Sequence, residues 1–244
     1  MRSVNFVKMV IDAYENNRGI FVNKINAEEL IPKKAGKLQR ALFIFYVLQL
    51  DYATKSQVLY KRANDLFAKK SEFFTPEIIL GLSDKELRDI LKKYLKPRYI
   101  NEAVKRYQIN STKLLSEFDG DPRNIFKVRS AKEVLKFTYE FRGFGPKIGN
   151  FFIRTMVNVF LYKYEDIDIV SLPVDVHDVK ITYLLGYLDS SVMSRKNIVI
   201  TKNTWMQACK KAKESWLIFD KALWLLGSEG KPKSKEDIYD LLGI

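Results

Sequence analysis

The chain of 244 residues is 47% hydrophobic and carries 42 Lys and Arg against 29 Asp and Glu, which gives a formal net charge of +13. A chain of this length can bury one sizeable core, or two lobes that share a cleft, without disulfides or metal. The single cysteine, Cys209, rules out an internal disulfide and argues against an iron–sulfur cluster with four cysteine ligands. The single histidine, His177, argues equally against a zinc site made of protein side chains.

Hydrophobic residues recur at helical spacing through the first half of the chain, so we expect helices there. The dense apolar stretch 41–50 is typical of a buried central helix. The other expected helices are one capped by Ser3, one through 58–67, two short ones near Thr75 and Ser83, and one that Pro97 opens toward Leu115.

The second half continues the pattern, and the prediction for the whole chain is an all-α fold. Ser130 and Glu133 have the spacing of a capping box, which predicts a helix from Ser130 through Phe141. Only 167–170 is expected to be extended, and it is too short to imply a sheet. The remaining expected helices are 147–162, 176–187, 203–216, 217–227 and a short one after Ser234.

The segment between the helices at 130–141 and 147–162 has the composition of a tight turn. Gly143 and Gly145 flank one apolar residue and allow positive φ and a close backbone approach, while Pro146 suits the first turn of the next helix. Lys147 is then expected at a helix N-terminus, where backbone N–H groups can hold a phosphate. The plainer alternative is that Lys147 is one basic residue among many and has no special role.

Two segments resemble the helix-hairpin-helix DNA glycosylase superfamily. Residues 141–149 are similar to its Leu-Pro-Gly-Val-Gly-x-Lys-x-Ala hairpin, with departures at Arg142 and Gly149, and residues 172–177 are similar to its Pro-Val-Asp-x-His segment. The resemblance implies two helical lobes with the hairpin and an active-site cleft at their junction. We expect a middle lobe over 40–125 and a second lobe made of 1–39 with 126–244, which carries the hairpin motif at 130–163.

The resemblance assigns catalytic roles to Lys147 and Asp175. Lys147 is implied to be the nucleophile, and a helix N-terminus favours its uncharged amine. Asp175 is implied to stabilise positive charge on the sugar, and it can also be a helix N-cap with Asp178 as its capping-box partner. Gly143, Gly145 and His177 are implied to contact DNA phosphates, although His177 can equally be a structural histidine.

A base pocket follows from a similarity to archaeal 8-oxoguanine glycosylases. Phe151 and Trp224 are implied to stack on the extruded base, Asp220 to read its edge, and Pro173 to line the pocket. Gln49 is a weaker match to a polar segment that contacts the lesion, and Tyr52 is a candidate wedge. Core packing is the alternative for the aromatic residues.

The function that the resemblance implies is a bifunctional 8-oxoguanine DNA glycosylase and apurinic-site lyase of base excision repair. The resemblance implies no cofactor and allows a monovalent cation at the hairpin. The expected partner is double-stranded DNA that contains a damaged base, consistent with the basic charge. Since the chain shows neither an apolar run of about 18 residues nor a signal-peptide pattern, we expect an intracellular monomer in the cytoplasm or nucleoid, with no membrane partner. The alternatives are a glycosylase for an alkylated purine or a mismatched pyrimidine, and a non-catalytic DNA-binding module.

Overall fold

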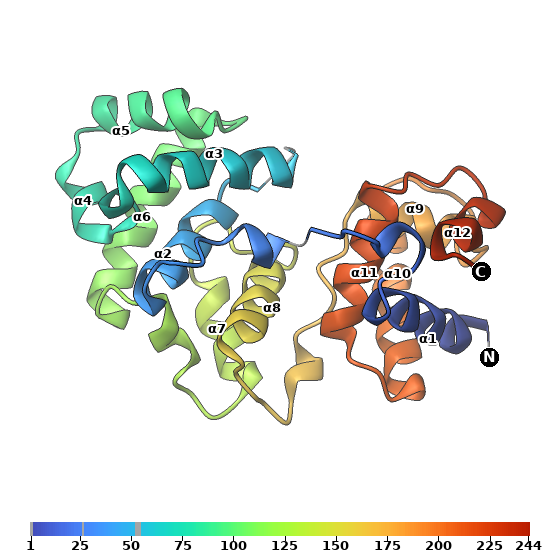
Figure 1. The fold of residues 1–244 in the computed structure, drawn as a ribbon. Helices are drawn as coiled ribbons and strands as arrows, with labels where there is room; N and C mark the ends of the chain where they lie inside the picture. Colours follow the sequence, from blue (N-terminus) through green and yellow to red (C-terminus); the bar gives the residue numbers. More distant parts are fainter. Residues whose placement is uncertain (1, 26, 52–54) are drawn as a thin grey trace. The chain divides into compact units, whose positions relative to one another are not determined.

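A computed structural model describes residues 2–25, 27–51 and 55–244. These residues form twelve α-helices and no β-strand, so the prediction of an all-α fold is confirmed (Figure 1). None of the helices in these ranges is long and apolar enough to cross a membrane.

The chain divides into two compact units. The terminal unit consists of Met1–Asn26 and Ser171–Ile244, and the central unit consists of Ala27–Val170. The helices of the terminal unit are α1 (Arg2–Glu15), α9 (Val176–Leu184), α10 (Arg195–Ala212), α11 (Trp216–Ser228) and α12 (Lys235–Leu242). Those of the central unit are α2 (Lys37–Leu48), α3 (Ser56–Lys69), α4 (Pro76–Gly81), α5 (Asp84–Ile90), α6 (Ile100–Phe118), α7 (Ala131–Tyr139) and α8 (Ile148–Phe160).

Helix α2 forms the core of the central unit. Its residues from Ala41 to Leu48 are all buried, as expected for a helix that is apolar on every side. The Phe45 ring lies 5.3 Å from that of Phe144 and 5.9 Å from that of Phe152. Helix α8 and the turn before it are therefore fixed to the centre of this unit by aromatic packing.

The core of the terminal unit surrounds Trp205 of α10. Its ring lies 5.3 Å from Phe6 of α1 and 5.4 Å from Phe219 of α11, and its Nε1 donates to Thr182 Oγ1 of α9 at 2.8 Å. This one buried side chain contacts three other helices of the unit, although these helices come from opposite ends of the sequence. The two ends of the chain are thereby joined in one fold.

Several boundaries differ from those expected. Residues 167–169 form a 3₁₀ turn and not an extended segment, because Asp166 N-caps this turn and its carboxylate also binds the first amides of α7. Helix α10 ends at Ala212, where Lys213 turns left-handed, and the expected helix 203–216 therefore began too late and ended too late. Residues 126–170 pack with the middle of the chain, whereas the expected second lobe grouped them with both termini.

Candidate active site

The turn between α7 and α8 presents Lys147 at the start of a helix. Gly143 adopts a φ of +85°, which a residue with a side chain rarely adopts, and Phe144 is buried in the aromatic core. Lys147 is the N-cap residue of α8 and is exposed, and the Gly149 amide donates to the Gly145 carbonyl at 2.7 Å. Phe144 thus anchors the turn in the core, while the side chain of Lys147 is exposed to solvent.

Gly149 and Arg142 of this turn are each fitted to their surroundings. At Gly149, a Cβ atom would lie 2.9 Å from the Phe144 carbonyl oxygen and 2.9 Å from the Tyr139 ring, so alanine does not fit without a shift. At Arg142, the backbone amide donates to Asn110 Oδ1 at 2.8 Å, a bond that proline cannot make. A hydrogen bond from the Arg142 amide to Asn110 therefore secures the turn at this position.

Asn110 of α6 connects the turn to the end of α2. This side chain is fully buried, and its Nδ2 donates both to the Arg142 carbonyl at 3.0 Å and to Gln49 Oε1 at 2.8 Å. Gln49 is itself 2% exposed, and its Nε2 donates to the Phe45 carbonyl at 3.1 Å. The predicted lesion contact at Gln49 thus has its amide engaged inside the central unit, which favours a supporting role for it.

An ion-pair cluster on α6 lies next to this network. Glu102 accepts from Arg142 Nε at 2.9 Å and from Arg106 Nε at 3.2 Å, and Arg106 also donates to the Gln49 carbonyl at 3.0 Å. The hydrogen bond from Arg142 is the largest of the effects that lower the pKa of Glu102, to about 2. The Glu102 carboxylate is therefore ionised in the folded protein at any pH well above this pKa. Its ion pair holds the guanidinium of Arg142 close to α6.

We expect Asn110→Leu to lower the free energy of unfolding by about 2–4 kcal/mol, since each buried polar group left without a partner costs ~1–3 kcal/mol. The groups affected are the backbone N–H and C=O of Arg142 and the side chain of Gln49. Urea unfolding measures the change. The matched control is Thr112→Val on the same helix, which removes one exposed hydrogen bond to the Gln108 carbonyl. A loss no larger than that of the control would mean that Asn110 does not hold the turn.

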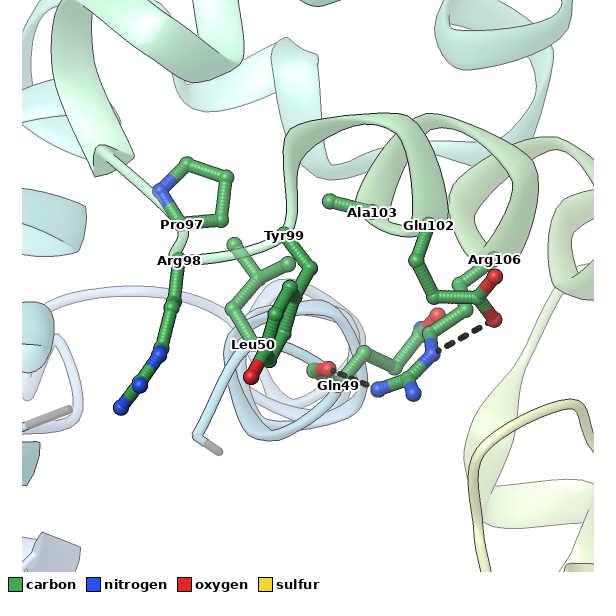
Figure 2. A pocket seen from close by; sticks show the side chains of 8 residues that line it. All are labelled: Gln49, Leu50, Pro97, Arg98, Tyr99, Glu102, Ala103 and Arg106. Atoms are coloured by element: carbon green, nitrogen blue, oxygen red, sulfur yellow. Dashed lines mark hydrogen bonds and ion pairs between the residues drawn. The ribbon is translucent and has the colours of Figure 1, made fainter. Parts of the chain in front are cut away.

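A small hollow opens on the central unit beside Gln49 and Leu50 (Figure 2). It is lined by the exposed ring of Tyr99, by Arg98 and by the ion pair of Arg106 with Glu102. An aromatic face next to the guanidinium of Arg98 suits the base and phosphate of a nucleotide. The wedge candidate, Tyr52, lies outside the described residues.

Phe151, the predicted stacking residue, lies on α8 and is partly exposed. The guanidinium of Arg154, one turn further along, lies 4.7 Å from the centre of its ring. Arg154 is buried and forms an ion pair with Glu28 at 3.5 Å. The Phe151 ring is thus positioned by a cation–π contact from a fixed arginine.

In the terminal unit, Asp175 is the N-cap of α9. Its Oδ1 accepts from the amide of His177 at 2.8 Å and from that of Asp178 at 3.3 Å, while Asp178 Oδ2 accepts from the Asp175 amide at 2.8 Å. The capping box expected from the sequence is therefore present. Asp175 is only 7% exposed, so its carboxyl group is largely enclosed at the start of α9.

The predicted base-reading residues lie on α11, which packs against α9. Asp220 is 3% exposed, and Trp224, one turn later, is partly exposed. Pro173 is buried just before α9. At Gly227 the two helices come so close that a Cβ atom would lie 2.7 Å from His177 Cβ, so this glycine sets how near Asp220 comes to the start of α9.

The structure thus groups the predicted residues in two sets. Within the central unit, Gly143, Gly145, Lys147 and Phe151 share the turn and the first part of α8. Within the terminal unit, the α9–α11 pair carries Asp175, His177, Asp220 and Trp224. The sequence analysis did not single out Asn110, Glu102 and Arg154. The one feature that could have drawn attention to them is a polar or charged residue at a helical position that is buried or half-buried.

No group of His, Cys, Asp and Glu side chains in the described parts of the chain is arranged to hold a metal ion. The sequence matches no protein-family model, and no curated protein is similar enough to indicate a common origin.

Proposed function

We propose that this protein is a DNA glycosylase with apurinic-site lyase activity, and that its substrate is 8-oxoguanine in duplex DNA. The observation that carries the proposal is the exposed lysine at the N-terminus of α8, presented by a turn whose middle residue, Phe144, is locked in the core. The proposed class of reaction comes from the resemblance of residues 141–149 to the hairpin of the DNA glycosylases. The net charge of +13 is consistent with a DNA partner.

In the proposed reaction, Nζ of Lys147 forms a bond to C1′ of the damaged nucleotide while the bond from C1′ to the base breaks. The departing base takes up a proton, and the positive charge that builds on the sugar is stabilised by the Asp175 carboxylate. The amine of Lys147 gives up one proton, the C1′–O4′ bond then breaks while O4′ takes a proton from water, and a protonated Schiff base joins Lys147 to the opened sugar. Loss of a proton from C2′ to water then breaks the C3′–O bond, and the 3′ phosphate leaves. The pairing of an exposed lysine with Asp175 favours an enzyme over a non-catalytic DNA-binding module, because binding alone does not need both.

The amide groups of the turn and His177 are proposed to contact phosphates of the DNA backbone. Such contacts position the duplex without reading its sequence. The hollow beside Tyr99 and Arg98 is a further place on the central unit where the DNA chain can lie.

The extruded base is proposed to stack on Phe151 and Trp224, with Asp220 facing its N7 edge. 8-Oxoguanine carries a hydrogen at N7, whereas guanine has a lone pair there. A carboxylate oxygen accepts the first and repels the second, so a single acceptor separates the damaged base from the normal one.

We expect Asp220→Asn and Trp224→Ala to lower excision of 8-oxoguanine much more than strand cleavage at a preformed abasic site, where no base has to be read. For Trp224→Ala the loss should correspond to about 1–3 kcal/mol of stacking. Single-turnover rates on the 8-oxoguanine duplex and on the abasic-site duplex measure the two losses separately. The control is Trp205→Phe, which changes a buried tryptophan of the core and should affect both activities alike. If the variants at 220 and 224 also lose both activities equally, these residues are scaffold and the lesion is read elsewhere.

A further inference from the structure

Asp178 differs from an ordinary capping-box residue because it is buried. In most capping boxes the acidic partner lies at the protein surface and is ionised. The Asp178 side chain is 1% exposed, and it lies near two other carboxyl groups, those of Asp175 and Asp220. Burial and these two neighbours all disfavour a negative charge on it.

The hydrogen bonds of Asp178 also disfavour a negative charge on its carboxyl group. Its Oδ2 accepts from the Asp175 amide, but its Oδ1 is buried and no donor within the described residues reaches it. A buried carboxylate oxygen without a donor is costly, whereas a protonated Oδ1 is itself a donor and needs only an acceptor. Asp175 is the other member of the same capping box, and its carboxyl oxygens are acceptors.

The two carboxyl groups differ in the backbone donors that they accept. That of Asp175 accepts two N–H groups at the start of α9, whereas that of Asp178 accepts one. Burial raises the pKa of Asp178 well above its usual range, and the charges of Asp175 and Asp220 raise it further. Within this pair, Asp178 is therefore the better place for a proton, since it accepts fewer donors and its Oδ1 accepts none from the described residues.

The groups around Asp178 come from each helix that packs on α9. Asp220 faces it from α11, and Asp175 faces it from the cap of α9 itself. On the α10 side, Trp205 donates to Thr182 Oγ1, which in turn donates to the Asp178 carbonyl at 2.6 Å. The two groups that act on the Asp178 carboxyl are thus both acidic.

We propose that Asp178 is a positioning residue that is neutral in the folded protein and donates its carboxyl proton to the Asp175 carboxylate. The pair then carries one negative charge, held in a fixed orientation at the N-terminus of α9. The effect on catalysis rests on the proposed glycosylase function, in which Asp175 stabilises the charged sugar. The neutrality of Asp178 does not depend on that function.

Asp178→Asn tests the neutral state, because an asparagine keeps one donor and one acceptor in the same shape. In the wild type, the folded protein retains a proton that the unfolded chain loses above about pH 4, so its folding equilibrium constant should fall by up to about tenfold per pH unit from there to the raised pKa of Asp178. Asp178→Asn should remove this slope, and its unfolding midpoint should rise relative to the wild type between pH 6 and pH 9. An infrared band of a protonated carboxyl group, present in the wild type at pH 7, should be missing from the variant.

Asp237 provides the matched control, since it holds the same capping-box position in α12. Its pKa is lowered, chiefly by the hydrogen bond from the Lys233 amide, so its stabilising effect is present at neutral pH and is lost as the pH falls. Asp237→Asn should therefore lower the unfolding midpoint at pH 7 and leave the infrared band unchanged. If Asp178→Asn behaves like Asp237→Asn in both measurements, Asp178 is ionised and the proposal is overturned.

Asp178→Leu tests the positioning role. It removes the hydrogen bonds to Asp175, and we expect excision to fall at least tenfold, with asparagine rescuing most of what leucine loses. Equal losses in the two variants would contradict positioning through a hydrogen bond. If the stability and infrared results are as predicted but no lesion is excised by the wild type, the proposed function fails while the neutral Asp178 stands.

Discussion

Lys147→Gln should abolish covalent trapping of the protein on DNA by borohydride and should leave its affinity for duplex DNA within a few-fold. The substitution removes the proposed nucleophile but only one of 42 basic residues, and binding is shared among many phosphate contacts. Trapping on a duplex with one 8-oxoguanine, together with a fluorescence binding titration, measures both effects.

The matched control for Lys147 is Lys132→Gln. Lys132 is also exposed and also lies in the first turn of a helix, α7, so the control removes the same charge from a similar place. It should be trapped at the wild-type rate. A Lys147→Gln protein that still forms the adduct at that rate would show that another amine is the nucleophile.

Asp175→Asn should lower the rate of base excision by about 10²-fold or more, which corresponds to the loss of one electrostatic stabiliser of roughly 3 kcal/mol. Asparagine can still accept the amides of His177 and Asp178, so the start of α9 should remain folded. DNA binding should be retained. Single-turnover excision on the 8-oxoguanine duplex measures the effect.

Asp166→Asn is the control for the capping role. The Asp166 carboxylate accepts from the amides of Ala131 and Lys132 at the start of α7, and these bonds hold its pKa below the usual range. This variant should lose some stability and no excision activity. If Asp175→Asn likewise excises within a few-fold of the wild type while it unfolds cooperatively, Asp175 is a helix cap and not a catalytic residue.

The helices could be predicted because their signals are local. Ser130 caps α7 and Asp175 caps α9, as their spacing from Glu133 and Asp178 indicated. The apolar run that became α2 is buried as expected. The errors occur where a contact with a distant part of the sequence determines the local structure. An example is the 3₁₀ turn at 167–169, which was expected to be extended and whose N-cap, Asp166, accepts a hydrogen bond from the first residue of α7.

The environments of the site residues depend on tertiary packing and could not be predicted. The pattern around Asp178 is the same as that around Asp237, yet one side chain is buried beside Asp220 and the other binds surface amides. Gln49 looked available to a base, but Asn110, which is distant in the sequence, binds its side chain. The ion pair of Arg142 likewise depends on Glu102, which is distant from it in the sequence.

The most direct test of the central claim is borohydride trapping of the wild-type protein on a set of duplexes, followed by mass spectrometry of the trapped peptide. The set contains undamaged DNA, 8-oxoguanine, an alkylated purine, a mismatched pyrimidine and a preformed abasic site. We predict adducts with the 8-oxoguanine and abasic-site duplexes, with the mass increase on the peptide that contains Lys147. No adduct with any duplex, or an adduct on a different lysine, would contradict the account.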